Sequence, residues 1–201
     1  MNIKTFKGGY DRNFAYLVYD EKERKAIALD PVLPKEILDF MKKQKLELVF
    51  IMNTHSHFDH TSGNQELISK TNAELLVLKE NEVVELASLT ISVIATPGHT
   101  DDDVCILINS SALFTGDTLF VGKIGGNFES NSEIQFKSLK KLMQLDNNII
   151  IYPGHDYGET PTTTIKHEKE TNPFIQRLNN YDDFIWLKEN WAKYKQEHNI
   201  K

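Results

Sequence analysis

The stretch His55-Ser56-His57-Phe58-Asp59-His60 places three imidazoles and a carboxylate within six residues of the chain. It follows the apolar run Leu48-Val49-Phe50-Ile51-Met52, which is typical of a buried strand, and Asn53-Thr54 would bring the chain out at the carboxyl end of that strand. In sheets flanked by helices, ligands bind at the carboxyl ends of the strands. Neutral imidazole and carboxylate together favour zinc, iron or manganese over calcium or magnesium. The stretch therefore predicts a metal site at a strand end.

Polar groups elsewhere favour this site over the alternative, which is a solvated His-rich surface loop. Five of the seven histidines follow expected strands, namely His55, His57, His60, His99 and His155. Asp117, in Thr115-Gly116-Asp117-Thr118, also follows an expected strand. Taken singly, His99 and His155 would fit turns, and Asp117 would fit a carboxylate that caps a turn. Their shared position at strand ends predicts that they gather around one site.

Length and composition indicate an ordinary soluble globular protein. The 201 residues are enough for one well-buried core, or for one core with a small appendage. Hydrophobic residues make up 40% of the chain, yet no apolar run approaches the roughly 20 residues that span a bilayer. The first residues lack the apolar core of a signal peptide, and the single cysteine, Cys105, excludes an intrachain disulfide. We expect a cytoplasmic protein with no membrane partner, and a buried Cys105.

The charge of the chain bears on its partners. The formal net charge is −6, which argues against non-specific binding to nucleic acid. Two Lys-rich stretches, Lys42-Lys43 and Lys137 to Lys141, are expected to be solvated helix faces. We therefore expect no nucleic-acid partner, and nuclease activity is a distant alternative. The sequence leaves the oligomeric state open.

Strands outnumber helices in each half of the chain, and each half ends in helices. The expected strands are Ile3–Gly8, Asn13–Tyr19, Lys25–Asp30, Leu46–Met52, Ala73–Leu78, a β-rich stretch Val83–Ala95, Val104–Ile108, Ala112–Thr115 and Ile149–Tyr152. The expected helices are Pro34 to about Gln44, Ser62 to Thr71, one capped by Ser130 or Asn131 that ends near Leu145, and most of the chain after about Thr162. Two sheets face to face with helices outside would satisfy this pattern. We expect a single domain over residues 1–201, with a short helical C-terminal extension over about 162–201.

The order and spacing of the polar groups resemble those of the metallo-β-lactamase superfamily of αβ/βα sandwich hydrolases. The resemblance rests on the His-x-His-x-Asp-His signature at residues 55–60 and on the later His, Asp and His, and it runs from about Asn13 to Pro173. It implies an α+β fold, built as a four-layer αβ/βα sandwich. It also implies two divalent metal ions, with zinc preferred and iron or manganese as alternatives. The implied ligands are His55, His57 and His99 for the first metal, Asp59, His60 and His155 for the second, and Asp117 as a bridge between them.

This ligand set suits hydrolysis. Two divalent ions a few ångströms apart can trap a bridging hydroxide, because bound water acidifies from a pKa of about 15.7 to near 7. The same ions polarise a carbonyl, and Asp59 is expected to be the catalytic residue that accepts or relays a proton. A structural zinc needs only four closed ligands, so the larger set argues against a non-catalytic metal-binding protein.

Two branches of the superfamily share features with the chain. Gly116-Asp117-Thr118-Leu119-Phe120 and His155-x-Tyr157 are similar to glyoxalase II, a glutathione thioester hydrolase, which implies a metal-dependent thioesterase acting on a small molecule. Pro153 to Tyr157 is similar to the persulfide dioxygenases, as is Thr163-Thr164-Ile165 with Glu168, Thr171, Asn172 and Pro173. Those enzymes hold one iron through counterparts of His55, His99 and Asp117, a set suited to non-heme iron. Thioester hydrolysis is the leading expectation, and the iron-dependent sulfur dioxygenase is the alternative.

The positions that would bind glutathione depart from the glyoxalase II pattern. The Lys and Tyr that glyoxalase II offers to glutathione fall here on Gly126 and Phe128, and the Arg-Thr-Asp segment of the dioxygenases is replaced by Gly125-Gly126-Asn127. Lys123 would either reach the substrate in their place or be a solvated surface lysine. The Tyr157 hydroxyl would either contact substrate or pack. The candidate substrate contacts are therefore Lys123, Phe128 and Tyr157, and the use of glutathione is left open.

Overall fold

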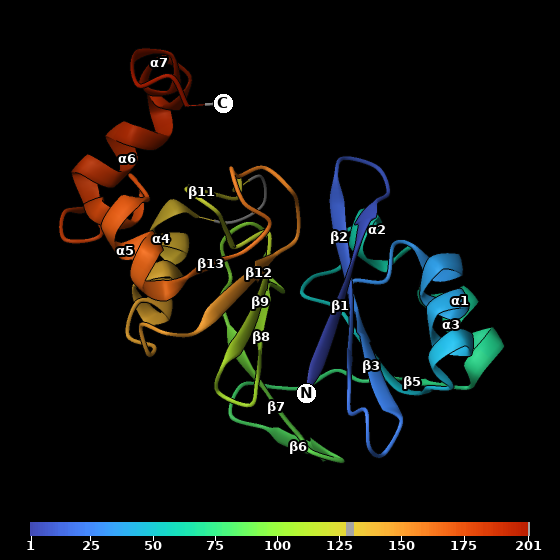
Figure 1. Ribbon diagram of the computed structural model, residues 1–201. Coiled ribbons are helices and arrows are strands. Elements are labelled where there is room, and N and C mark those ends of the chain that lie inside the picture. The colour runs from blue at the N-terminus through green and yellow to red at the C-terminus, as the bar shows by residue number, and fades with distance from the viewer. Residues whose placement is uncertain (128–130, 201) are drawn as a thin grey trace.

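Two β-sheets lie face to face in the computed structural model, which describes residues 1–127 and 131–200 (Figure 1). The first sheet has the strand order β1-β2-β3-β4-β5, the second has the order β13-β12-β9-β8-β7-β6, and β10 pairs with β11. The strands are β1 (Asn2–Gly8), β2 (Asn13–Tyr19), β3 (Lys25–Leu29), β4 (Glu47–Met52), β5 (Glu74–Leu75), β6 (Val83–Leu86), β7 (Leu89–Ala95), β8 (Val104–Ile108), β9 (Ala112–Gly116), β10 (Leu119–Phe120), β11 (Lys123–Ile124), β12 (Ile150–Pro153) and β13 (Thr163–Thr164). The helices are α1 (Pro34–Gln44), α2 (Phe58–Thr61), α3 (Asn64–Thr71), α4 (Ser132–Leu142), α5 (Ile165–Thr171), the 3-10 helix η1 (Ile175–Arg177), α6 (Tyr181–Glu189) and α7 (Trp191–Glu197).

Alternating side chains of the strands divide the core into layers. In β2, Phe14 and Tyr16 point into the cluster between the two sheets, whereas Ala15 and Leu17 point outward. The outer face of the first sheet packs against Ile37 and Met41 of α1 and Leu67 of α3. The outer face of the second sheet packs against α4, α5 and α6, through residues that include Leu139, Ile165 and Phe184. The arrangement is the expected α+β, four-layer αβ/βα sandwich.

Local sequence explains where the best-predicted helices begin. α1 begins with proline at its first turn, where the missing N–H costs nothing, and it ends at Gln44, which is followed by Lys45 with a left-handed φ of 55°. α4 begins after Asn131, whose side chain accepts a hydrogen bond from the backbone N–H of Glu133. The predicted bounds of β2, α1 and β8 agree with the structure.

Other predicted elements are wrong in their extent. The helix expected over Ser62–Thr71 begins at Asn64, as α3, and the preceding single-turn helix α2, which ends at Thr61, was not predicted. Gly63 lies between the two helices. A Cβ at Gly63 would lie 1.7 Å from the backbone oxygen of Pro31, so this position needs glycine for a close approach of two segments. The β-rich stretch Val83–Ala95 is confirmed in its bounds, and it is a hairpin of β6 and β7 that turns at Ala87, whose φ is 54°.

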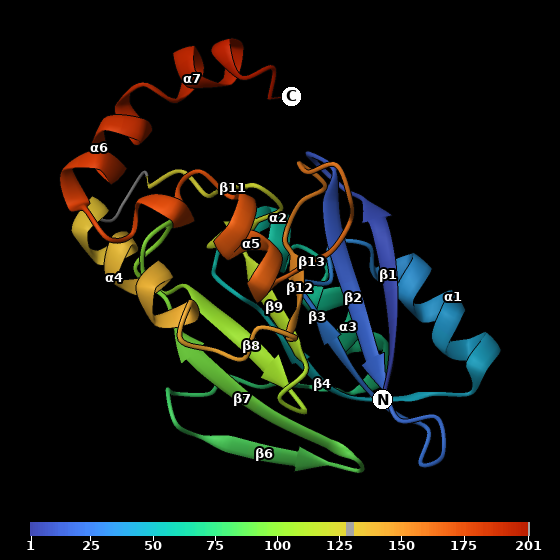
Figure 2. The same cartoon turned by 60° about the vertical axis from the view of Figure 1, so that its left-hand side comes forward.

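Short elements account for the remaining differences. The strand expected over Ala73–Leu78 covers only two residues, and the two-residue strands β10 and β11 were not predicted. The helix expected to end near Leu145 ends at Leu142. After residue 162 the chain first adds β13 to the sheet, and its later helices are interrupted at Asn190, between α6 and α7. Figure 2 shows α6 and α7 curving away from the second sheet.

The burial of single residues follows from their elements, and the expected burial of Cys105 is confirmed. Cys105 is fully buried in β8, and burial raises the pKa of its thiol to about 12. His167 and His198 are exposed. Phe184 and Leu187 are buried, and Trp191 and Tyr194 pack against the same cluster. Across residues 1–127 and 131–200, every helix is too short or too polar to cross a bilayer.

The two sheets are joined directly near the end of β12. The Phe14 N–H donates a hydrogen bond of 2.8 Å to the carbonyl oxygen of Gly154, which follows β12. The Tyr16 hydroxyl donates one of 2.7 Å to the carbonyl oxygen of Pro153. These contacts fix the carboxyl end of β12 against β2, and His155 comes next in the chain.

Candidate metal centre

Seven side chains from four separate parts of the chain meet at strand ends of both sheets. The segment after β4 carries two of them, the single-turn helix α2 carries two more, and β7, β9 and β12 are each followed by one. They form three overlapping groups whose possible ligand atoms all lie within 4.8 Å of one another in each group. The groups are His55, His57 and His99; Asp59, His60 and His155; and His55, His60 and Asp117.

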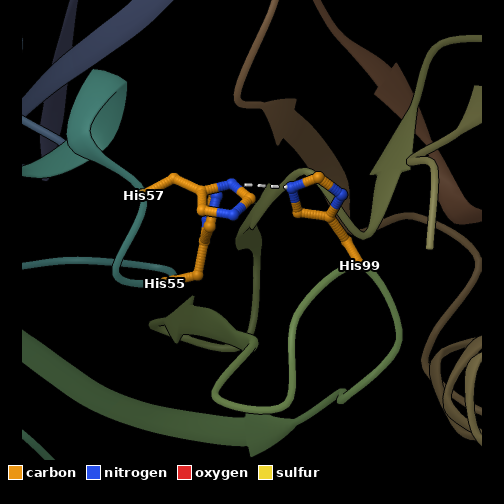
Figure 3. Close-up of side chains that lie close together, drawn as sticks. All are labelled: His55, His57 and His99. Carbon is orange, nitrogen blue, oxygen red and sulfur yellow. Dashed lines mark hydrogen bonds between the residues drawn. The ribbon is translucent and has the colours of Figure 1, made fainter. Parts of the chain in front are cut away.

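The first group is made of three imidazoles that face one another (Figure 3). The Nε2 of His99 lies 3.0 Å from the Nδ1 of His57. The rings of His55 and His57 have centroids 4.7 Å apart, and those of His55 and His99 are 5.1 Å apart. His55 and His99 are buried and His57 is partly buried, and one nitrogen of each ring lies within 4.8 Å of the other two.

The second group combines one carboxylate with two imidazoles. The Oδ2 of Asp59 lies 3.4 Å from the Nε2 of His155 and 3.8 Å from the Nε2 of His60. Both histidines are buried, whereas the Asp59 side chain is 31% exposed. The carboxylate therefore lies at the solvent side of this group.

Asp117 lies between the two groups. Its Oδ1 is 3.4 Å from the Nε2 of His60 and 3.3 Å from the Nε2 of His155, and its Oδ2 is 3.6 Å from the Nε2 of His99. Burial raises the pKa of Asp117, but the close approach and the charges of His155 and His60 outweigh burial and hold this pKa far below its usual range. An ionised carboxylate with one oxygen towards each group is a geometry that suits a bridge.

Hydrogen bonds at Nδ1 fix the tautomer of three histidines. The acceptors are the Gly126 carbonyl oxygen for His99 at 2.6 Å, the Asp11 carbonyl oxygen for His155 at 2.8 Å, and the Asp30 carboxylate for His60 at 2.9 Å. These oxygens only accept, so each Nδ1 donates, and in a neutral ring Nε2 is then the nitrogen whose lone pair can bind a metal. Metal-binding histidines are held in this way.

Unsatisfied polar atoms support metal binding. In the described parts of the chain, the buried atoms His55 Nε2, His60 Nε2 and Asp117 Oδ1 have no hydrogen-bond partner. A buried polar atom without a partner is costly, and such atoms need a functional explanation. Burial and the charge of His60 lower the pKa of His55 to about 4, which keeps this imidazole neutral. The donor set therefore fits divalent metal ions of the zinc, iron or manganese type.

Close packing around Asp117 leaves no space for a side chain at Gly116 or Gly154. Gly116 has a left-handed φ of 48°, and a Cβ there would lie 2.2 Å from the Oγ1 of Thr54. A Cβ at Gly154 would lie 2.5 Å from the Oδ1 of Asp117 and 2.8 Å from the Cε1 of His60. These two glycines let β9 and β12 end directly against the ligands.

Supporting residues escaped the sequence prediction. Asp30 was interpreted only as the end of a strand, yet its buried carboxylate accepts from the Thr54 backbone N–H at 2.8 Å as well as from His60. Asp103 is buried, and its carboxylate accepts from the backbone N–H groups of His99 and Thr100, both at 2.8 Å. The only available signal for Asp30 was a carboxylate at the end of a buried strand.

Of the three candidate substrate contacts, the structure describes Lys123 and Tyr157. Lys123 is partly buried rather than solvated, and its Nζ donates to the Tyr157 carbonyl oxygen at 2.6 Å. Burial, with the charges of Lys195 and Arg12, lowers its pKa. Tyr157 donates to the Asp11 carboxylate at 2.7 Å, and its ring stacks on the His155 imidazole with centroids 4.8 Å apart. Phe128 lies outside the described residues.

Comparison with known sequences gives consistent matches. The family model described as the Metallo-beta-lactamase superfamily matches residues 8–85 and 75–155. A hydroxyacylglutathione hydrolase from Francisella tularensis subsp. novicida is 37% identical over 174 residues, which cover 78% of this chain and 68% of the relative. A hydroxyacylglutathione hydrolase from Dictyostelium discoideum is 32% identical over 193 residues, which cover 85% of this chain and 72% of the relative.

Solved structures with a similar fold include ETHE1 and a metallo-beta-lactamase. ETHE1 from Myxococcus xanthus is similar with a TM-score of 0.86 and 30% sequence identity, over 95% of this chain and 91% of that one. A metallo-beta-lactamase from Staphylococcus aureus is similar with a TM-score of 0.85 and 26% identity, over 92% of this chain and 65% of that one. The sheets and helices described above are therefore shared with these proteins.

Proposed function

The chain belongs to the metallo-beta-lactamase superfamily, and from this premise we propose that it is a metal-dependent hydrolase that cleaves thioesters of small molecules. The observation that carries the proposal is the pair of three-residue groups joined by Asp117. The relatives named hydroxyacylglutathione hydrolase support the thioester as the bond that is cleaved.

The proposed ligands divide into two sets. The three imidazoles of the first group would hold one metal, Asp59 and the two imidazoles of the second group would hold the other, and Asp117 would serve both. We propose zinc for both positions, because imidazole and carboxylate are its common protein ligands. Iron and manganese suit the same donors, so direct metal analysis has to distinguish them.

The residues of the site divide the work of hydrolysis. Two bound divalent ions would supply an acidified water and a polarised thioester carbonyl. Asp59 would orient the attacking water and take its proton at Oδ1, because its Oδ2 already accepts a hydrogen bond from Asn13. The proton then passes to the departing thiolate, so water and thioester become a carboxylic acid and a thiol. Asp117 would hold both ions in place during the reaction, because one of its oxygens lies towards each group.

Recognition of the thiol carrier is the part of the site that differs from glyoxalase II. Gly126 faces the site through its backbone oxygen, which accepts from His99, and it has no side chain to offer a substrate. Each lost charge-assisted hydrogen bond would cost about 1.5–3 kcal/mol, roughly a ten- to hundredfold loss in specificity. We propose that S-lactoylglutathione is hydrolysed inefficiently, with Lys123 as a candidate cationic side chain for the carrier.

A second candidate function is the oxidation of a persulfide by dioxygen, which a single bound iron would catalyse. His55, His99 and Asp117 make the two-histidine, one-carboxylate set of non-heme iron enzymes. The segment similar to the dioxygenases has a supporting role here, because Glu168 accepts from the Gly122 backbone N–H at 3.0 Å and Asn172 donates to the Lys123 carbonyl oxygen at 3.2 Å. It positions the β10–β11 hairpin, which either chemistry could use.

Metal content and turnover, measured on one preparation, separate the two functions. We expect two zinc ions per chain and a measurable kcat/KM on small thioesters, with S-lactoylglutathione no better than simpler thioesters. One iron per chain, with oxygen consumption on glutathione persulfide and no thioester turnover, would establish the dioxygenase instead. The His57→Ala variant is the matched test, since His57 belongs to the proposed zinc ligands and is absent from the iron set.

A further inference from the structure

Asn13, the first residue of β2, is fully buried beside the second group of ligands. It is the residue at which the β1–β2 turn, residues 9–12, enters the first sheet. A buried primary amide offers two donors and an acceptor with two lone pairs, and all of them need partners. Its partners in this structure lie on two sides, towards Asp59 and towards the turn.

The amide nitrogen of Asn13 makes its two shorter hydrogen bonds to Asp59, and it also lies 3.4 Å from the Nε2 of His155, another side chain of the second group. Nδ2 donates to the Asp59 carboxylate oxygen Oδ2 at 3.0 Å and to the Asp59 carbonyl oxygen at 3.1 Å. One amide group therefore holds the carboxylate and the backbone of the same residue, which fixes the side-chain rotamer between them. Because the Asp59 side chain is 31% exposed, water would compete for that carboxylate without this tether.

The amide oxygen of Asn13 completes the connection to the turn. Oδ1 accepts from the backbone N–H groups of Tyr10 at 3.1 Å and Asp11 at 3.0 Å. The Asp11 carbonyl oxygen in turn accepts from the Nδ1 of His155. Residues 11 and 13 thus orient two of the three side chains in the second group, while Asp30 orients the third, His60.

Electrostatics explains why an asparagine suits position 13. A lysine or arginine could donate to Asp59 but would repel a divalent cation nearby, and an aspartate would repel the Asp59 carboxylate. A neutral amide donates without adding charge. Partners of metal-binding side chains typically affect metal affinity by about 10- to 100-fold.

We propose that Asn13 is a positioning residue that holds the Asp59 carboxylate in place for the second metal. The inference rests on the two-metal assignment made above. It concerns the relative affinity of the two metal positions, so its main readout is binding of Zn²⁺ rather than turnover.

The test compares Asn13→Ala with a control that removes an equally buried asparagine. Asn172 is also fully buried, and it donates to Glu168 and to the Lys123 carbonyl oxygen, so Asn172→Ala removes a similar set of hydrogen bonds away from the ligands. Stepwise Zn²⁺ affinities are measured by competition with chelators. We expect Asn13→Ala to weaken the weaker-binding step by about 10- to 100-fold and to leave the tighter step unchanged, while Asn172→Ala changes neither step.

A double-mutant cycle shows whether Asn13 acts through Asp59. In the Asp59→Ala background, Asn13→Ala should cause no further loss of Zn²⁺ affinity, because the group that it orients is gone. Full additivity of the two losses would overturn the proposal and assign Asn13 to general folding. Asn13→Leu keeps the buried volume without the donor, and it replaces the alanine variant if that variant does not fold.

Failure of this inference and failure of the proposed function give different results. If the unaltered protein binds two Zn²⁺ ions and Asn13→Ala binds both with unchanged affinity, only the role of Asn13 is wrong. If the unaltered protein binds a single Zn²⁺ ion, the two-metal assignment is wrong and the role of Asn13 falls with it.

Discussion

Residue-scale chemistry at this site depends on which histidine nitrogen carries the proton. His60, His99 and His155 each donate from Nδ1 to an oxygen of the protein, so their Nε2 atoms are left for ligation. The acceptors are two backbone carbonyl oxygens and one buried carboxylate, and none of these oxygens can become a hydrogen-bond donor while the carboxylate is ionised. The protein therefore prepares ligand atoms before any ion arrives, and preorganisation of this kind lowers the cost of binding.

Asp59 gives the first prediction at this scale. Asp59→Asn keeps the shape of the side chain and removes the negative charge that a ligating carboxylate contributes. We expect weaker binding of the second metal and a loss of kcat greater than the roughly hundredfold typical of a supporting residue, with folding and occupancy of the first position retained. Metal content, melting temperature and kcat are measured on the same preparation.

The opposite outcome is equally clear. Two tightly bound metals with near-normal turnover in Asp59→Asn would mean that Asp59 is only a loop carboxylate. If the variant does not fold, His60→Ala and His155→Ala, which remove the other side chains of the same group, address the same position.

Residues of the site differ in how far the sequence could predict them. The signature at residues 55–60 is local, so the ligands in it are visible in the sequence alone. Asn13 and Asp59 are separated by 46 positions, and Asp30 and Thr54 by 24. Nothing in the neighbourhood of Asn13 or Asp30 indicates these partners, because the contacts exist only once β2, β3 and β4 lie side by side.

Elements with strong internal patterns were predicted well, whereas elements defined by their neighbours were not. β2 and α1 have clear apolar periodicity and fit their predicted bounds. β5 consists of two exposed residues that pair with β4 at the sheet edge, and only that pairing makes them a strand. The break between α2 and α3 has the same origin, since it depends on the Pro31 backbone that approaches Gly63.

Two hairpins on different sheets meet at Asp20. This contact gives a prediction at the scale of elements. The Asp20 carboxylate after β2 accepts from the Ser88 hydroxyl in the β6–β7 turn and from the backbone N–H groups of Lys22 and Glu23, both at 2.8 Å. The Ser88 bond is the largest of the effects that lower the pKa of Asp20 from 3.8 to about 2. A lowered carboxyl pKa stabilises the folded state when the group is ionised.

The sign of the pH dependence follows from that shift. The contribution of Asp20 is fully present above its unfolded pKa of 3.8 and is lost as the pH falls towards about 2. Ser88→Ala should therefore lower the free energy of unfolding at neutral pH, and the difference from the unaltered protein should shrink between about pH 4 and pH 2. Urea unfolding at a series of pH values measures this. The exposed Ser111 provides Ser111→Ala as a control with little expected change, and a difference that stays constant with pH would contradict the prediction.

At the scale of the whole molecule, each sheet is built from one continuous part of the chain. β1 to β5 lie within residues 2–75, and β6 to β13 lie within residues 83–164. The first part contributes the ligands of the 55–60 signature, and the second contributes His99, Asp117 and His155. We propose that the C-terminal helices belong to the same folding unit, because Phe184 and Leu187 complete the core beneath the second sheet.

Because each sheet comes from one stretch of chain, the protein should still assemble when it is supplied in two pieces. Residues 79–82 are exposed and lie between β5 and β6, so a cut between Glu80 and Asn81 leaves every strand pairing within one fragment. We expect fragments 1–80 and 81–201 to associate, and Zn²⁺ to tighten that association, because the proposed ligands come from both pieces. Titration of one labelled fragment with the other, with Zn²⁺ and with a chelator, measures the effect. A cut in the β8–β9 turn divides a sheet, and the resulting fragments are the control that should reassemble poorly. If Zn²⁺ does not change the affinity of fragments 1–80 and 81–201 for each other, the ions do not stabilise their association.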